Sequence, residues 1–334
     1  MTEWLKDWLL EPKNDLHMIE KIVIVIPQYN DSVALNLLIE CINKDVSPDI
    51  LANTTLAIVD DCSTEAIEIR ASFKGRGIKI IRLYRNVGHQ RAIALGLSYV
   101  AKEFECDKTI VMDADGEDAP KDINMLVKAS MLQPDKIIFA QRSSRQESSL
   151  FKVFYEVYKF IFKQLTGKII TFGNFSIIPR RRLQNLVRVS EIWNNYPGGV
   201  IKSRLAYTSI PLQRGKRLAG NSKMNFVSLV LHGLSAISVS IDVVAVRILI
   251  LSIGLSFLTF VGLAVIVYFK TITDLAVPGW ASQLGSAFLL MILQLFLISL
   301  FLVFTVLQYR TQQQYIPVKF YKDFIESVED VSSC

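Results

Sequence analysis

KTIVMDADGED, residues 108–118, is the stretch that decides the fold of this 334-residue chain. Its first five residues are mostly β-branched and apolar, which predicts a buried strand, Lys108–Met112. Carboxylates follow at once, at Asp113, Asp115, Glu117 and Asp118. Because ligands of open α/β sheets bind beyond the carboxyl ends of the strands, acids in this place predict a ligand site.

The spacing of Asp113 and Asp115 suits a hard divalent cation. Two such carboxylates can hold Mg²⁺ or Mn²⁺, and the ion can bridge a diphosphate. Crowded carboxylates also repel one another unless a cation lies between them. A D-x-D pair alone is common in acidic loops, so it is the position after a buried strand that favours a metal site.

The first 140 residues repeat this alternation of strand and helix. Apolar residues follow helical spacing within 33–42 and 93–104. Further Ile- and Val-rich runs predict strands at Lys21–Ile26, Thr55–Val59, Lys79–Leu83 and Lys136–Ala140. The alternation predicts an α/β domain with a mostly parallel sheet and helices on both faces.

Polar motifs follow three more of these strands. They read PQYND at 27–31, DDCS at 60–63 and RNVGHQR at 85–91. Each motif alone is an ordinary turn sequence. At successive strand ends they predict a nucleotide site, in which Tyr29 lies against a base or ribose and Asp60 accepts hydrogen bonds from it.

Two uncharged apolar runs, Ile248–Phe269 and Leu284–Leu307, predict transmembrane helices. Each is long enough to cross a hydrocarbon core of ~30 Å at ~1.5 Å per residue. Basic residues flank the pair on one side, at Arg247, Arg310, Lys319 and Lys322. The positive-inside rule therefore places both termini and the polar part of the chain in the cytoplasm.

Three further segments could lie at the membrane surface, and two of them also have a second interpretation. Residues 149–165 combine a basic face with an aromatic apolar face. This pattern fits a membrane-interface helix and a core helix with one solvent-exposed face equally well. Residues 225–246 predict a helix along the membrane surface, and residues 4–9 either a short interfacial helix or a frayed terminus. The predicted units are 1–20, 21–224, 225–246, the hairpin 247–308 and a cytoplasmic tail 309–334.

Composition narrows the class of protein. The net charge is +6, and the basic residues gather at 142–182 and 202–223, which suits phosphate groups or simply a solvated surface. Four scattered cysteines argue against a disulfide framework or a structural zinc site, and fit a reducing compartment. The first 20 residues hold four acids and no apolar run, so no secretory signal is expected.

Together the motifs resemble family 2 of the inverting glycosyltransferases, which use a GT-A fold. Within it the chain looks like the polyprenyl-phosphate branch related to dolichyl-phosphate mannose synthase and bactoprenol glucosyltransferase. The P-x-Y-N-E, D-D-x-S and R-N-x-G-H-Q motifs of the family are matched by 27–31, 60–63 and 85–90, with Asp31 in place of Glu. Its D-A-D-L-Q-D-P-P is similar to 113–120, where Gly116 and Glu117 replace Leu-Gln, its G-S-R to 140–142, and its R-x-x-G-x-S-K to 217–223.

The resemblance implies roles for particular residues. The nucleoside and diphosphate would contact Pro27, Tyr29, Asp31, Asp60, Asp61, Asn86, Asp113 and Ser222. Asp113, Asp115 and Glu117 would hold Mg²⁺ or Mn²⁺, and the catalytic groups would be Asp115, Asp118, Arg142, Arg217 and Lys223. The three basic residues of this set would meet phosphates of the donor or the lipid.

One departure from the branch concerns the acceptor. Where the branch has G-D-F-R, this chain has Gly173–Ser176, GNFS, and no E-D pair follows that could act as a base. A phosphate monoester is largely ionised near neutral pH, since its second pKa is about 6, so it needs little help from a base. The departure favours a lipid-phosphate acceptor; the alternative is that Asn174 only shapes a turn and another acid, for instance Asp118, is the base.

The sequence thus predicts an integral protein of a bacterial inner or plasma membrane that transfers a sugar from a UDP- or GDP-sugar to a polyprenyl phosphate. Its partners would be the donor, the lipid-linked acceptor and membrane lipids, and no nucleic-acid partner is expected. The chain could also form homo-oligomers. One rival is transfer to a sugar hydroxyl of a lipid-linked saccharide. The other is a non-catalytic membrane scaffold, against which the retained Asp113, Asp115, Arg217 and Lys223 argue.

Overall fold

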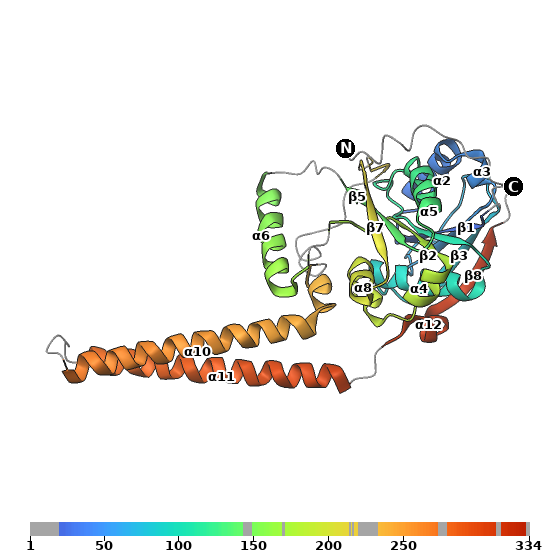
Figure 1. Cartoon of the computed structure of the whole chain (residues 1–334). Helices are drawn as coiled ribbons and strands as arrows, with labels where there is room; N and C mark the ends of the chain where they lie inside the picture. Colours follow the sequence, from blue (N-terminus) through green and yellow to red (C-terminus); the bar gives the residue numbers. More distant parts are fainter. Residues whose placement is uncertain are drawn as a thin grey trace.

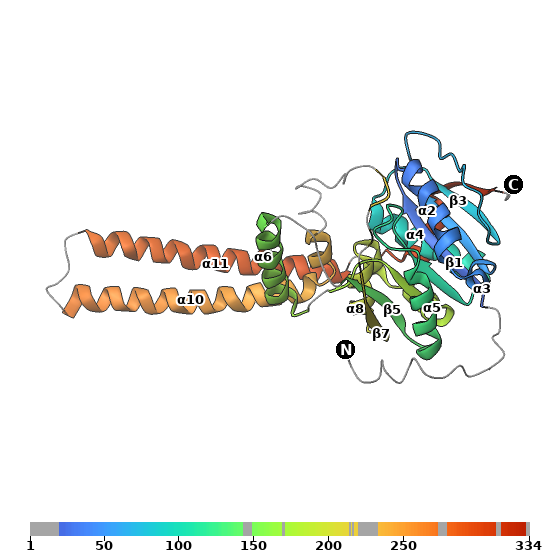
Figure 2. The same cartoon turned by 90° about the horizontal axis from the view of Figure 1, so that it is seen from above.

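A computed structural model describes residues 20–142, 149–168, 171–213, 215, 217–219, 233–272, 279–311 and 315–331. It consists of an α/β domain and a long helical hairpin that projects from one side of it (Figures 1 and 2). The expected interfacial helix at 4–9 lies outside the described residues.

The domain is built on one mixed sheet, in the order β7-β5-β6-β4-β1-β2-β3-β8. The pairs β1–β2, β1–β4, β2–β3 and β5–β7 are parallel, whereas β6 and β8 run antiparallel to their neighbours. The predicted strands are confirmed, with bounds that differ by a few residues. The strands are β1 Ile22–Gln28, β2 Thr54–Asp60, β3 Gly77–Leu83, β4 Lys108–Val111, β5 Ile137–Arg142, β6 Ser176–Pro179, β7 Tyr207–Leu212 and β8 Ile325–Val331.

Helices cover both faces of the sheet, because successive side chains of a buried strand point to opposite faces. In β1, Ile24 and Ile26 pack with one set of helices and Val23 and Val25 with the other. The first set is α2 Ser32–Asp45, α3 Pro48–Leu51 and α5 Asp122–Leu132. The second is α4 His89–Glu103, α7 Arg180–Leu186, the 3₁₀ turn η1 Ser190–Trp193 and α8 Tyr196–Ser203.

Helix α4 lies unusually close to the sheet at Gly96. A Cβ atom at this position would lie 2.6 Å from Val25 Cγ1 and 2.7 Å from Val59 Cγ2. Only glycine permits this approach, since the fully buried side chains of Val25 and Val59 leave no room for a Cβ. The close packing fixes the amino end of α4 beside the ends of β1 and β2.

The C-terminal segment is not the separate tail that we expected at 309–334. After α12 Pro317–Phe320 and η2 Tyr321–Phe324, β8 joins the sheet antiparallel to β3. Lys79 Nζ lies 2.6 Å from Asp330 Oδ1, and Arg82 Nε lies 3.0 Å from Glu329 Oε1. Strand β8 is acidic and has no apolar run, so only the complementary charges of its neighbour mark it as an edge strand.

The hairpin consists of α10 Ile241–Ile272 and α11 Trp280–Thr311, of 32 residues each. At ~1.5 Å per residue each helix exceeds the ~30 Å of a hydrocarbon core. Of the most apolar stretch, 17% is buried in α10 and none in α11. Core helices of a soluble protein would be covered, so the two predicted spans are confirmed as helices able to cross a membrane.

The predicted surface helix 225–246 stays a prediction over most of its length. Residues 225–232 lie outside the described part, and residues 241–246 form the first turns of α10 instead. Helix α6, Ser149–Thr166, crosses α10 near this end (Figures 1 and 2). Arg247 Nη1 lies 2.5 Å from the Gln164 carbonyl oxygen, so a residue of α10 caps the last turn of α6.

Candidate active site

The polar motifs of the sequence meet at the carboxyl edge of β1, β2 and β4, as parallel strands require. The β1 and β2 loops are joined through Gln28, whose Nε2 donates to Asp60 Oδ1 at 3.3 Å and to Ser63 Oγ at 3.0 Å. Asn30 adopts a left-handed conformation, with φ 51°, and its Oδ1 accepts from the Thr64 amide at 2.8 Å. These bonds leave the Tyr29 ring 41% exposed at the rim.

Asp61 holds the loop after β3 in place. Its two carboxylate oxygens accept from the backbone amides of Val87 and Gly88 at 2.7 and 2.8 Å. Burial raises the pKa of Asp61, and the two amides oppose this rise. Gly88, with φ 90°, then begins α4. We had expected Asp61 to contact a nucleoside, but both of its oxygens are engaged by the chain itself.

Of the other nucleoside residues, Asp60 is 2% exposed and also accepts from the Ser63 amide at 3.1 Å. Pro27 is buried within β1, whereas Asn86 is exposed on the loop after β3. The described members of the expected set therefore lie at one edge, and of these Tyr29, Asp31, Asn86 and Asp113 reach the surface.

Arg217 bridges two of the expected site acids. Its Nη1 lies 3.3 Å from Asp115 Oδ2 and its Nη2 lies 3.4 Å from Asp31 Oδ2. All three side chains are between 20% and 23% exposed, so the ion pairs are partly shielded from water. Burial, followed by the charge of Asp113, raises the pKa of Asp115, while Arg217 opposes the rise.

Backbone contacts hold Arg217 in this place. The Leu218 amide donates to the Asp115 carbonyl at 2.9 Å, and the Gly215 amide donates to the Glu117 carbonyl at 2.8 Å. Gly116 has φ 81°, and a Cβ there would lie 2.3 Å from Leu218 Cγ. The Gly116 that replaces a family Leu is thus required by the segment that carries Arg217.

A hydrogen-bonded chain fixes the orientation of Asn174. The backbone amide of Tyr196, which can only donate, lies 2.7 Å from Gln90 Oε1. Gln90 Nε2 therefore donates to Asn174 Oδ1 at 3.1 Å. Asn174 Nδ2 then faces His89 Nε2 at 3.0 Å and Asp113 Oδ1 at 3.5 Å. Asn174 presents a donor to Asp113, where an aspartate would present a second negative charge.

Two further titratable groups border Asp113. Asp118 Oδ2 accepts from the Asp113 backbone amide at 3.0 Å, and its side chain is 3% exposed. His89 Nε2 lies 3.2 Å from Asp113 Oδ1. Burial favours the neutral imidazole, but the neighbouring carboxylates, Asp113 first, outweigh it and raise the pKa of His89.

The structure does not bring every expected residue together. Ser222 and Lys223 lie outside the described residues, as does the side chain of Arg142. Within the described part of the chain, no three His, Cys, Asp or Glu side chains gather as metal ligands. Glu117 therefore stays a prediction as a third ligand beside Asp113 and Asp115.

The sequence reasoning missed Gln90 and Tyr196 as parts of the site. Gln90 stands in the RNVGHQR motif, which was a usable signal. Tyr196 gave none, because its contact is a backbone amide 106 residues from Gln90 along the chain.

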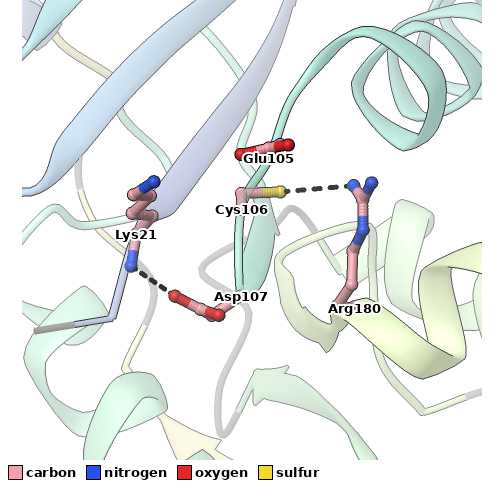
Figure 3. Close-up of a pocket in the computed structure, with 5 residues that line it drawn as sticks. All are labelled: Lys21, Glu105, Cys106, Asp107 and Arg180. Carbon is pink, nitrogen blue, oxygen red and sulfur yellow. Dashed lines mark hydrogen bonds between the residues drawn. The ribbon is translucent and has the colours of Figure 1, made fainter. Parts of the chain in front are cut away.

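A hollow of about 280 Å³ lies at the opposite, amino edge of the sheet (Figure 3). Its lining residues are Lys21, Glu105, Cys106, Asp107 and Arg180. The Lys21 amide donates to Asp107 Oδ2 at 2.8 Å, and Arg180 Nη1 donates to the Val100 carbonyl at 3.3 Å. These groups serve the chain itself, so the hollow is not part of the candidate site.

Residues 23–187 match the model of the family described as glycosyl transferase family 2. The chain is 27% identical over 271 residues to an uncharacterized glycosyltransferase, YkcC, of Bacillus subtilis (strain 168), covering 78% of this chain and 80% of the relative. It is 27% identical over 237 residues to the undecaprenyl-phosphate 4-deoxy-4-formamido-L-arabinose transferase of Salmonella newport (strain SL254), covering 65% of this chain and 66% of that relative.

Among solved structures, the chain is similar to glucosyl-3-phosphoglycerate synthase from Mycobacterium tuberculosis in complex with Mn²⁺, UDP-glucose and phosphoglyceric acid. The identity is 16% and the TM-score 0.48, with 67% of this chain and 80% of that chain covered. The same enzyme in complex with Mn²⁺, UDP and phosphoglyceric acid is 15% identical, with a TM-score of 0.49.

Proposed function

Residues 23–187 form a glycosyltransferase family 2 domain, and from this premise we propose that the enzyme transfers a sugar from a nucleoside diphosphate sugar to a polyprenyl phosphate. A phosphate oxygen of the acceptor attacks the anomeric carbon, and the bond from that carbon to the donor diphosphate breaks on the opposite face. The products are a polyprenyl phosphate sugar of inverted configuration and a nucleoside diphosphate.

The donor diphosphate needs positive charge, and the site is suited to a divalent cation. Arg217 lies between Asp31 and Asp115 and offsets their negative charges. This arrangement supports the proposal that the acids of the site are occupied by a cation. Asp113 and Asp115 would hold Mg²⁺ or Mn²⁺, and the ion would offset charge on the leaving diphosphate. Arg217, released from the carboxylates, would then turn to the diphosphate as a bidentate donor.

The orientation of Asn174 is the observation that carries the choice of acceptor. Its amide nitrogen, not an oxygen, faces Asp113, so this position supplies no base. The other acid that we considered, Asp118, is buried and bound to the backbone of Asp113, which supports excluding it as well. A hydroxyl acceptor would have to give up a proton here, whereas an ionised phosphate would not.

The position of the site relative to the hairpin fits a lipid acceptor. The two apolar helices indicate a membrane protein, and both of their domain-side ends lie beside the α/β domain (Figure 1). In helix α6, Phe160 and Ile161 are 63% and 45% exposed, and Lys159 and Lys163 stand nearby. We assign α6 to the membrane interface, with the domain on the cytoplasmic side as the positive-inside rule requires.

The test uses the purified full chain in detergent with Mg²⁺ or Mn²⁺ and a panel of radiolabelled UDP- and GDP-sugars. Undecaprenyl phosphate and a lipid-linked saccharide are the acceptors, each in its own reaction, and undecaprenol and a reaction without acceptor are the controls. We expect label in the lipid phase only with the phosphate, and its loss in Asp115→Asn. Label transferred to a lipid-linked saccharide but not to the phosphate would overturn the choice of acceptor and favour the hydroxyl alternative.

A further inference from the structure

Residues Ser190–Ser203, which form η1 and α8, lie between the hairpin and the active site. In both views α8 lies on the side of the domain from which the hairpin projects (Figures 1 and 2). We call Ser190–Ser203 the coupling segment. Its outer end contacts both membrane helices and its inner end contacts the hydrogen-bonded chain that leads to Asp113.

At the outer end, one ammonium group joins four elements. Lys202 Nζ of α8 donates to the Val239 carbonyl at 2.8 Å and to Asp242 Oδ1 of α10 at 3.1 Å. It also lies 3.5 Å from Glu191 Oε1 of η1 and 5.9 Å from the ring centroid of Tyr309 in α11. The Lys202 side chain is only 22% exposed, so these contacts are partly desolvated and stronger than surface pairs.

Packing supports the same attachment. Trp193 of η1 lies 4.3 Å, between ring centroids, from Tyr315, which follows α11. Gly198 of α8 lies against the segment that precedes α10, since a Cβ there would be 3.3 Å from Val239 Cγ2. The coupling segment is therefore fastened to the hairpin on both sides, next to α10 and next to α11.

At the inner end, Tyr196 is completely buried. Its backbone amide donates to Gln90, and its hydroxyl lies 2.6 Å from Ser176 Oγ. Gln90 in turn orients Asn174 against Asp113. A helix of eight residues is ~12 Å long, so one rigid element spans the distance from the hairpin to the active-site network.

We propose that the coupling segment holds the active site at a fixed position relative to the bilayer, with Lys202 as its positioning residue. The inference deepens the proposed function, on which it rests for the identity of the acceptor. A lipid phosphate is fixed in depth by the headgroup layer, so its attack on the donor depends on where the hairpin holds Asp113. A misplacement of about 1 Å can lower a rate by up to ~10²-fold.

The experiment compares two acceptors with Lys202→Met in the full chain, reconstituted in liposomes. One acceptor is undecaprenyl phosphate in the bilayer. The other is a water-soluble short-chain prenyl phosphate, which can reach the site from solution wherever the domain lies relative to the bilayer. We expect the rate with the embedded acceptor to fall about tenfold and that with the soluble acceptor to stay within about twofold. Lys319→Met, the same change at an exposed lysine of α12, is the control and should alter neither.

Asp242→Ala should reproduce part of the selective loss, because it removes one of the contacts that Lys202 makes. The double variant should lose little more than Lys202→Met, since that single change already removes the contact with Asp242. An equal loss with both acceptors would reduce Lys202 to a general structural role and overturn the proposal. An unchanged rate with the embedded acceptor would also overturn it.

A second readout does not depend on the acceptor. Spin labels at Leu132→Cys on α5 and Leu251→Cys on α10, in a chain without its native cysteines, report the distance between domain and hairpin. We expect a broader distance distribution in Lys202→Met than in the control Lys319→Met. If the unaltered enzyme transfers no sugar to either phosphate, the proposed acceptor fails, while a broadened distribution still supports the coupling and an unchanged one overturns it.

Discussion

Strand β4 has an acid and an arginine near each of its ends, and the two edges use them differently. At the amino edge, Asp107 accepts a backbone amide, and Arg180 donates to a backbone carbonyl. At the carboxyl edge, Asp115 and Arg217 face each other across the mouth of the site. The hollow lies at the amino edge (Figure 3). The ion pair between Asp115 and Arg217 lies at the carboxyl edge. We therefore expect the chemistry at the edge where the acids and the arginine pair with one another, and not at the edge that holds the hollow.

The largest difference between the two edges is expected from the same substitution, Asp to Asn, at each end of β4. Asp115→Asn should lower sugar transfer about 10³-fold, because it removes a ligand of the proposed cation and with it the charge that offsets the leaving diphosphate. Asp107→Asn should leave the rate within about twofold, since an asparagine oxygen still accepts the Lys21 amide. Steady-state transfer rates measure both, and equal losses would show that the two edges do not differ.

The next test exchanges the arginines for lysine. Arg217→Lys should lower transfer about 10- to 100-fold, because an ammonium cannot reach Asp31 and Asp115 through two separate nitrogens or grip a phosphate in bidentate fashion. Arg180→Lys at the amino edge should change the rate less than twofold. Full activity in Arg217→Lys would mean that a point charge suffices, and that the bridge between the two acids has no role in the reaction.

We expect that Asp61, unlike Asp115, stabilises the fold and does not take part in the reaction, because its carboxylate accepts from two backbone amides. Asp61→Asn should lower the free energy of unfolding by about 1–3 kcal/mol, since an amide cannot accept from both Val87 and Gly88. For a domain of this size the midpoint of thermal unfolding would fall by several degrees, about 2–4 °C per kcal/mol. Asp31→Asn should weaken donor binding and leave the midpoint nearly unchanged; the reverse pattern would exchange the roles of the two residues.

The difference between Asp61 and Asp115 also shows where sequence reasoning ends. The buried strands were predictable, because over the first 140 residues runs of Ile and Val alternate with segments whose apolar residues follow helical spacing. An acid that follows a strand can face a ligand or bind the backbone of the next loop, and both look the same in the sequence. Only the fold shows that the amides of Val87 and Gly88 come to Asp61.

Contacts between distant segments were out of reach for the same reason. The GNFS departure located Asn174, but not the direction of its amide, which depends on Gln90 and on the backbone of Tyr196. Strand β8 was missed because an edge strand needs no apolar run when its acids pair with Lys79 and Arg82 across the ladder. In each case the information lies in a partner that is far away along the chain.

The smallest expected effect concerns the protonation of Asp115. Burial, Asp113 and then Glu117 raise its pKa above the ordinary value of 3.8. A carboxylate must be ionised to bind a cation, so metal-dependent binding of a nucleoside diphosphate should weaken as the pH falls through this raised pKa. The diphosphate titrates as well, with a pKa of about 6, so a single binding curve against pH mixes the two groups.

Comparing the enzyme with Glu117→Gln removes the titration of the ligand, because both proteins bind the same nucleotide. Without the negative charge of Glu117 the pKa of Asp115 should fall, and the acid midpoint of binding should move down by on the order of a few tenths of a pH unit. The affinity at neutral pH should change little if Glu117 acts only through its charge. A loss of affinity of tenfold or more would instead make Glu117 the third metal ligand that the sequence predicts, and the ion would then be held by three carboxylates at the carboxyl edge.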